Sequence, residues 1–146
     1  MVSAFFMPVY HERITLIVYI MAKFYYNTRD DLICIDTDLV AAVKADGNYS
    51  KILYISGKVI NLSCGITRLE EILKSTASKQ NRYVRLGRSY IINHAYLYKL
   101  EPLKQQIILS DGIHPDLKIP MPKQTIKTYK DAMEKRSEVI KQKANT

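Results

Sequence analysis

The sequence contains little that could support catalysis or metal binding. Its 146 residues include two cysteines and three histidines, and no histidine has a cysteine or carboxylate partner at metal-ligand spacing. Glycine-rich phosphate loops and the sharp strand-to-helix turn that carries a catalytic serine are also missing. These absences predict a protein that is not an enzyme and that uses no cofactor, metal or small-molecule substrate.

Secretion and membrane insertion are also poorly supported. Cys34 and Cys64 are too few for a disulfide scaffold, and both lie in apolar, strand-like stretches that predict reduced core thiols. The mainly apolar run at residues 14–22 has nine residues, whereas a membrane-spanning helix needs roughly 20. Its flanking residues do not follow the order of a signal peptide. We therefore expect a cytoplasmic protein without a membrane span.

One domain accounts for most of the chain. The length and the 47% hydrophobic content suit one domain with a buried core and leave no room for a second. The predicted division is an N-terminal extension at residues 1–30, a β-rich domain at residues 31–133 and a basic helical tail at residues 134–146. The extension need not belong to the native protein, because Met21 is a more natural start.

Positive charge is concentrated in the second half of the chain. Residues 81–146 carry 13 Lys or Arg against 6 Asp or Glu, whereas residues 31–80 carry 6 of each. Nearly all of the formal net charge of +8 therefore lies downstream of residue 80. Clustered basic groups favour nucleic acid as a partner, because neutralising phosphates releases counterions. An anionic membrane surface would attract the same groups, and lysine-rich tails also occur simply for solubility.

Short strands dominate the predicted secondary structure. Between residues 32 and 62, apolar or alternating runs are separated by glycine-containing turns, which predicts antiparallel hairpins. Residues 66–74 repeat apolar side chains at intervals of three and four, as an amphipathic helix does. Further strands are expected at residues 96–100, 106–109 and 117–121, with the last at a sheet edge because of its prolines. From Lys123 onward, a narrow apolar stripe among lysines predicts a basic terminal helix.

Three arginines recur at three-residue spacing within residues 82–93, in a run of strand-forming residues. On one flat strand, Arg82 and Arg88 would share a face that Arg85 does not. A turn at Gly87 could bring them together. Two interpretations stay open: a β-built surface for phosphates or bases, or solvated and salt-bridged surface arginines.

A second strand is expected after this turn. Tyr90, Ile91 and Ile92 are aromatic or β-branched, so we expect them to pack in the core. Asn93 follows directly, and its side chain is expected to cap a turn rather than to contact a ligand.

Taken together, these segments resemble the LytTR DNA-binding domain. The resemblance rests on Asp46-Gly47-Asn48-Tyr49 before a strand, on the helix of residues 66–70, on residues 83–93 and on residues 119–123. The arginine-serine-aromatic-aliphatic-aliphatic-asparagine core carries most of its weight. It implies a mainly β fold: small antiparallel sheets in an elongated sandwich, with one short amphipathic helix and a basic C-terminal helix. It further implies that loops, not a recognition helix, enter successive major grooves of bacterial promoter DNA.

The resemblance also implies which residues contact DNA. By position, base contacts fall to Tyr49, Arg88 and Lys123, with Asn48 beside the first. A guanidinium suits this role, because it can bond the O6 and N7 atoms of guanine together. Phosphate contacts are expected from Arg82, Arg85, Ser89 and Lys127.

The expected function is sequence-specific binding of double-stranded DNA by a transcriptional regulator. Only about thirty residues precede the β-rich region, and a receiver domain needs roughly 100. We therefore expect a stand-alone regulator that binds repeated half-sites, as a dimer on DNA. Two alternatives stay open: a module that binds single-stranded nucleic acid by stacking on tyrosines, and a membrane-surface or protein-interaction module.

Overall fold

The structure is a computed structural model that describes residues 23–76 and 82–144, with side chains described as far as residue 137. Most of the predicted N-terminal extension and of the polar loop before Arg82 lies outside the described residues. The elements are β1 (Lys23–Asn27), β2 (Leu32–Asp36), the 3-10 turn η1 (Thr37–Leu39), β3 (Val40–Asp46), β4 (Tyr49–Tyr54), β5 (Val59–Leu62), α3 (Ile66–Thr76), β6 (Tyr83–Leu86), β7 (Tyr90–Asn93), the 3-10 turn η2 (His94–Tyr96), β8 (Leu97–Glu101), β9 (Gln106–Leu109), β10 (Leu117–Pro120) and α4 (Lys123–Ala144).

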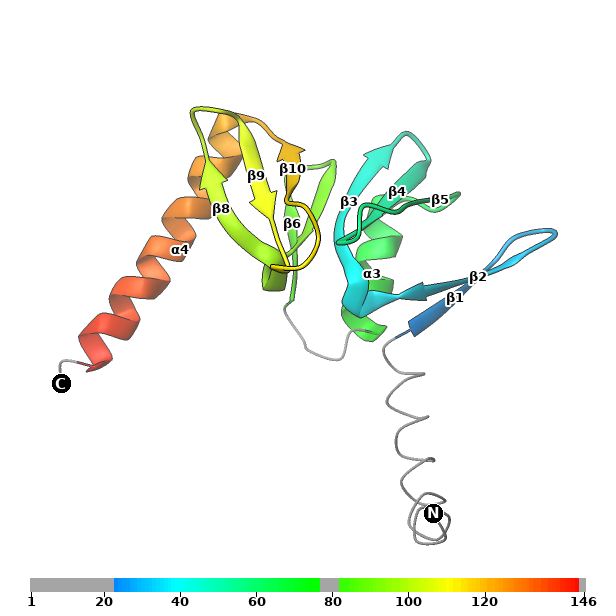
Figure 1. Ribbon diagram of the computed structural model, residues 1–146, viewed down its shortest axis with the longest axis horizontal. Coiled ribbons are helices and arrows are strands. Elements are labelled where there is room, and N and C mark those ends of the chain that lie inside the picture. The colour runs from blue at the N-terminus through cyan, green and yellow to red at the C-terminus, as the bar shows by residue number, and fades with distance from the viewer. Residues whose placement is uncertain (1–22, 77–81, 145–146) are drawn as a thin grey trace, which may run out of the picture.

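The strands form three small antiparallel sheets, as Figure 1 shows. The largest has the order β5-β4-β3-β7-β6, the second has the order β10-β9-β8, and β1 pairs with β2 alone. The predicted mainly β fold is therefore confirmed. β10 is an edge strand, as its prolines predicted, because a proline cannot donate a ladder hydrogen bond.

A hydrophobic cluster lies on each face of the five-stranded sheet. Ile91 and Ile92 are adjacent on β7, and both are fully buried, but they belong to different clusters. Successive side chains on a strand point to opposite faces, so a sheet covered on both sides buries both isoleucines. α3 packs Leu69 and Leu73 into the first cluster, while the three-stranded sheet and the start of α4 complete the second. This two-sided burial holds the hairpins of the sheet in fixed positions.

Asn93 connects three elements from a fully buried position. Its side-chain Nδ2 donates to the carbonyl oxygen of Val40 at 2.8 Å, and its Oδ1 accepts from the backbone N–H of Ala95 at 3.0 Å. The second bond caps η2. The predicted capping role is therefore confirmed, and the first bond adds a link from β7 to β3.

Among the α4 side chains that the structure describes, those of the first part of the helix pack against the domain. Ile126 and Tyr129 are buried and Met133 is partly buried, whereas residues 134–137 are exposed. The Tyr129 hydroxyl is hydrogen-bonded to the His94 ring. Burial raises the pKa of Tyr129 to about 12. The helix runs without a break across the predicted boundary at residue 134 and then projects from the domain (Figure 1).

Two features near the N-terminal end differ from expectation. β1 lies inside the segment predicted as an extension, yet it pairs with β2 along its length, and its Phe24 is buried in the core. Cys64 is buried as predicted, but the prediction that Cys34 is a core thiol is wrong. Within the described part of the chain no layer covers that side of β2, and Cys34 is exposed. None of the helices within the described residues combines the length and apolar character needed to cross a membrane.

Candidate nucleic-acid interface

Two hairpin turns lie side by side at one end of the five-stranded sheet. β3 and β7 are adjacent antiparallel strands, with Lys44 opposite Tyr90. The backbone N–H of Ala45 donates to the carbonyl oxygen of Ser89 at 2.8 Å, just before one turn and at the end of the other. The β3–β4 turn and the β6–β7 turn are therefore neighbours, although about forty positions separate them in the chain.

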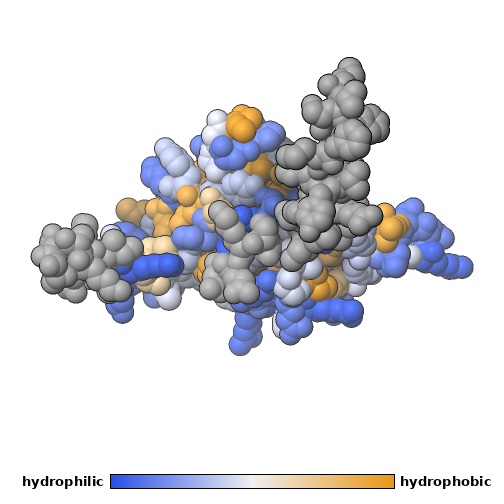
Figure 2. Space-filling view, turned by 90° about the horizontal axis from the view of Figure 1, so that it is seen from below, coloured by the Kyte–Doolittle hydropathy of each residue, from blue (hydrophilic) through white to orange (hydrophobic). Residues whose placement is uncertain are grey.

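The second sheet adds two more segments at the same end of the molecule. The backbone N–H of Met121 donates to the carbonyl oxygen of Gln105 at 3.0 Å, which joins the β8–β9 turn to the start of α4. In Figure 1 these segments and both hairpin turns lie along the top of the molecule. We call this end the turn edge, and it consists of residues 46–49, 87–89, 102–105 and 121–124. From the opposite end, apolar side chains of the described surface appear as separate patches among hydrophilic ones (Figure 2).

The β3–β4 turn presents Asn48 and Tyr49 to solvent. The turn has two residues between Asp46 and Tyr49, and Gly47 has a φ of 64°. Glycine reaches this left-handed conformation without steric cost, as the first position of a type II′ hairpin turn requires. Tyr49 is 58% exposed, so its ring and hydroxyl are both accessible.

The β6–β7 turn presents Arg88 and Ser89, which are both exposed. The turn begins at Gly87, which has a φ of 63°. The pairing of β6 with β7 ends at Leu86 and Tyr90, so Arg85 lies on the strand whereas Arg88 lies in the turn. Among the described residues, the Arg88 guanidinium has no ion-pair or hydrogen-bond partner. It is therefore available to an external acceptor.

Arg85 and Arg82 differ from Arg88, because carboxylates of this chain hold both. Arg85 pairs with Glu70 of α3 at 3.5 Å, and its Nη2 donates to the carbonyl oxygen of Arg88 at 2.9 Å. Arg82 pairs with Asp38 at 2.5 Å and has only 13% of its side chain exposed. Both arginine Nε atoms are buried without a partner among the described residues. Arg85 thus braces the turn that carries Arg88, while Arg82 lies below the turn edge.

The start of α4 supplies two exposed lysines. Lys123 is its first residue and Lys127 follows one turn later. A helix start carries unpaired backbone N–H groups and the positive end of the helix dipole. The first turn of α4 has no acidic residue to offset that charge. A groove lined by Arg85, Gly87, Gln124 and Thr128 separates this helix start from the β6–β7 turn.

The backbone of Gly87 allows a test of whether the β6–β7 turn depends on a positive φ at this position. Gly87→Ala is expected to lower the free energy of unfolding by about 1 kcal/mol, because an L-residue is strained at positive φ. Apart from Gly87 and its two chain neighbours, no atom of the described residues lies within 4 Å of an added Cβ, so the expected cost is backbone strain. Urea unfolding measures the loss. Gly87→Asn should lose less, since asparagine tolerates this conformation, and an alanine variant as stable as the parent would contradict the argument.

Comparison with known proteins shows which family this chain resembles. A family model described as the LytTr DNA-binding domain matches residues 30–134. The chain belongs to the LytTR family. A solved LytTr DNA-binding domain has the same fold; it comes from a Bacillus cereus protein described as a methyl-accepting/DNA response regulator. The TM-score is 0.52 at 12% sequence identity, covering 77% of this chain and 96% of that one. None of the curated proteins matches the chain.

Membership of the LytTR family supports DNA binding and a regulator-like role for this protein. The family is a DNA-binding family rather than a family of enzymes. The fold brings together four of the predicted contact residues on the paired hairpin turns and two at the start of α4. The residues on the turns are Asn48, Tyr49, Arg88 and Ser89, and those in the helix are Lys123 and Lys127. Their individual roles stay predictions.

Sequence reasoning missed the carboxylates that hold two of the arginines. Glu70 lies on the polar face of the amphipathic helix, and Asp38 lies in η1. Neither stands near its arginine in the chain, so no local pattern pointed to these ion pairs. The structure therefore distinguishes the three arginines. Arg82 and Arg85 are salt-bridged, whereas Arg88 has no partner among the described residues and stays a candidate for binding phosphates or bases.

Proposed function

We propose that this LytTR-family protein recognises specific sequences in double-stranded DNA through its turn edge. One observation carries the proposal: Arg88, Tyr49 and Lys123 are exposed, come from three separate segments and share one edge. None of the three has an intramolecular side-chain partner among the described residues. Their guanidinium, phenol and ammonium groups can all donate hydrogen bonds to base edges or phosphates.

The proposed base contacts follow from the chemistry of each group. Arg88 pairs with the O6 and N7 atoms of a guanine in the major groove. Tyr49 offers one hydroxyl or packs its ring, with the Asn48 amide beside it. Lys123 reaches a guanine edge or a phosphate.

Phosphate contacts from Ser89 and Lys127 set the register of the protein on the duplex, because phosphates carry no base identity. For Arg85 we propose a positioning role, in which it holds the Arg88 carbonyl and so the turn. A phosphate contact from Arg82 or Arg85 would require the arginine to share or leave its carboxylate partner.

The regulator is proposed to bind repeated half-sites in bacterial promoters as two copies, each contributing one turn edge. One turn edge offers only a few base-reading side chains, so a second copy would supply the remaining specificity. A protein acting on promoters works in the cytoplasm, where the bacterial chromosome lies.

Selection of duplexes from a random pool tests the proposal directly. The expected result is enrichment of a repeated motif, with selected duplexes binding at least tenfold more tightly than random ones, a ratio modest for specific recognition. Competition with single strands of the same sequence is the second measurement. Equal binding of all duplexes, or preference for single strands, would overturn sequence-specific duplex recognition and favour stacking on exposed tyrosines.

Lys127 provides a test of backbone contact. Lys127→Ala is expected to weaken binding to selected and random duplexes alike, and to reduce the slope of log K against log salt by about 1, because one phosphate contact is lost. Binding titrations at several salt concentrations measure both effects. The matched control is Lys58→Ala: Lys58 is also exposed, but it lies at the opposite end of β4 from the turn edge. Equal losses from the two variants would contradict the assignment.

A further inference from the structure

The β8–β9 turn, residues 102–105, belongs to the turn edge but has no role in the contacts proposed above. Gln106 lies opposite Pro120 in the strand register, and the Gln105 carbonyl accepts from Met121, so the turn lies beside the start of α4. Figure 1 shows it at the α4 end of the turn edge, beyond β10. Leu103 in this turn is 84% exposed, which indicates how far the turn projects. A duplex along the turn edge would meet this turn at one end of its contact.

The Glu101 carboxylate forms ion pairs with two lysines at the base of this turn. Lys104 Nζ lies 3.2 Å and Lys99 Nζ lies 3.7 Å from the same oxygen of Glu101, Oε2. The other oxygen, Oε1, accepts from Gln106 Nε2 at 2.9 Å. The Gln106 hydrogen bond and the two ammonium groups hold the pKa of Glu101 below its usual value, so the carboxylate stays ionised.

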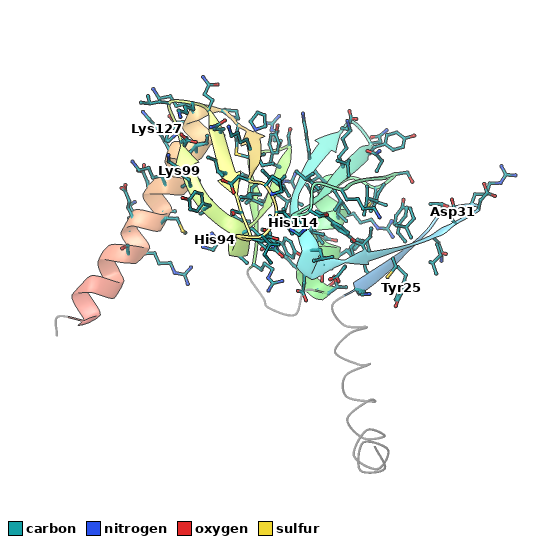
Figure 3. The ribbon with its side chains drawn as sticks, viewed as in Figure 1. Tyr25, Asp31, His94, Lys99, His114 and Lys127 are labelled. Atoms are coloured by element: carbon teal, nitrogen blue, oxygen red, sulfur yellow. The ribbon has the colours of Figure 1, made fainter. Side chains whose placement is uncertain are left out.

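Exposure differs sharply between the carboxylate and the lysines it gathers. The Glu101 side chain is only 9% exposed, whereas the Lys99 and Lys104 side chains are 58% and 71% exposed. The outward surface of the cluster is therefore cationic, with two ammonium groups for one shielded carboxylate. Exposed ion pairs of this kind are weak, so either lysine can turn to an external anion at little cost. In Figure 3, Lys99 lies on the same side of the molecule as Lys127 of α4, far from Asp31 at the tip of the β1–β2 hairpin.

We propose that Lys99 and Lys104 bind DNA phosphates just beyond the end of the recognised site, so that the β8–β9 turn forms an additional contact. This inference rests on the proposed function, and it extends the contacted length of duplex past the start of α4. Glu101 positions the two ammonium groups and does not contact DNA. The contact adds affinity without base preference, because phosphates are the same in every sequence.

The test compares two duplexes that share one wild-type-selected site: a short duplex ending at the site, and a long duplex with about ten further base pairs on each side, roughly one helical turn. The variant is Lys99→Gln with Lys104→Gln. On the long duplex it should bind about tenfold more weakly at 0.1 M salt, with a salt slope reduced by about 2. On the short duplex it should bind as the wild type does. The charge-matched control, Arg29→Gln with Lys58→Gln at two exposed positions away from the turn edge, should leave binding to both duplexes unchanged.

Glu101→Gln separates phosphate contact from turn structure. It breaks the same ion pairs but leaves both ammonium groups, so its binding to the long duplex should equal or exceed that of the wild type. A loss as large as that of the lysine variant would overturn the proposal, because disruption of the turn would then explain both. Unchanged binding by the lysine variant would also overturn it. The proposed function would survive either result if selected duplexes were still preferred over random ones.

Discussion

Arg88→Ala is expected to weaken binding to a selected duplex by about 1 to 3 kcal/mol while changing binding to random duplexes little. The Arg88 guanidinium, which has no partner among the described residues, is the best-suited group on the turn edge for a bidentate contact with one guanine. Such a contact exists only where the guanine is correctly placed, so its loss should affect the preferred site. Dissociation constants for both duplexes, measured at one salt concentration, give the difference.

Arg29→Ala is the matched control for this experiment. Arg29 is also an exposed arginine in a hairpin turn, but it lies between β1 and β2, in the hairpin that points away from the turn edge (Figure 1). It should leave binding to both duplexes nearly unchanged. Equal losses for Arg88→Ala on selected and random DNA would mean that Arg88 contacts a phosphate and does not read a base.

Asn93→Ala is expected to lower the free energy of unfolding by about 2 to 4 kcal/mol, the largest effect on stability predicted here. The substitution removes the donor to the Val40 carbonyl and the acceptor for the Ala95 N–H. Since Asn93 is fully buried, water cannot readily replace either partner. Urea unfolding followed by circular dichroism measures the loss.

Two further variants sharpen this prediction. Asn93→Asp keeps an acceptor for Ala95 but places a carboxylate against the Val40 carbonyl, so at pH 7 it should destabilise at least as much as alanine. Asn61→Ala, at an exposed position on the edge strand β5, should change stability by less than about 0.5 kcal/mol. A loss below about 1 kcal/mol for Asn93→Ala would show that the two hydrogen bonds contribute little.

Much of this protein could be predicted because its strongest signals are local. Glycine-containing turns between alternating strands predict hairpins, since few other residues adopt positive φ without strain. Ile66, Leu69 and Leu73 recur at helical spacing, and all three are buried. The run from Arg88 to Asn93 combines an exposed turn, a buried strand and a cap within six residues, which is why it carried most of the family resemblance.

Other features depend on pairings between distant parts of the chain. The sequence does not indicate that β3 pairs with β7, yet that pairing places Tyr49 and Arg88 on neighbouring turns. The carboxylates of Asp38 and Glu70 hold Arg82 and Arg85 across 44 and 15 positions, so only the fold distinguishes these arginines from Arg88. The exposure of Cys34 likewise depends on which layers cover a sheet.

The sequence by itself determined the strands from β2 onward, the turns between them, the two helices among the described residues and the family, because backbone preferences and hydrophobic spacing act over a few residues. Only the tertiary structure decided which side chains share the turn edge, which arginine is free among the described residues and where the β8–β9 turn lies. Those outcomes depend on strand order and sheet packing, which bring together groups that no local pattern connects.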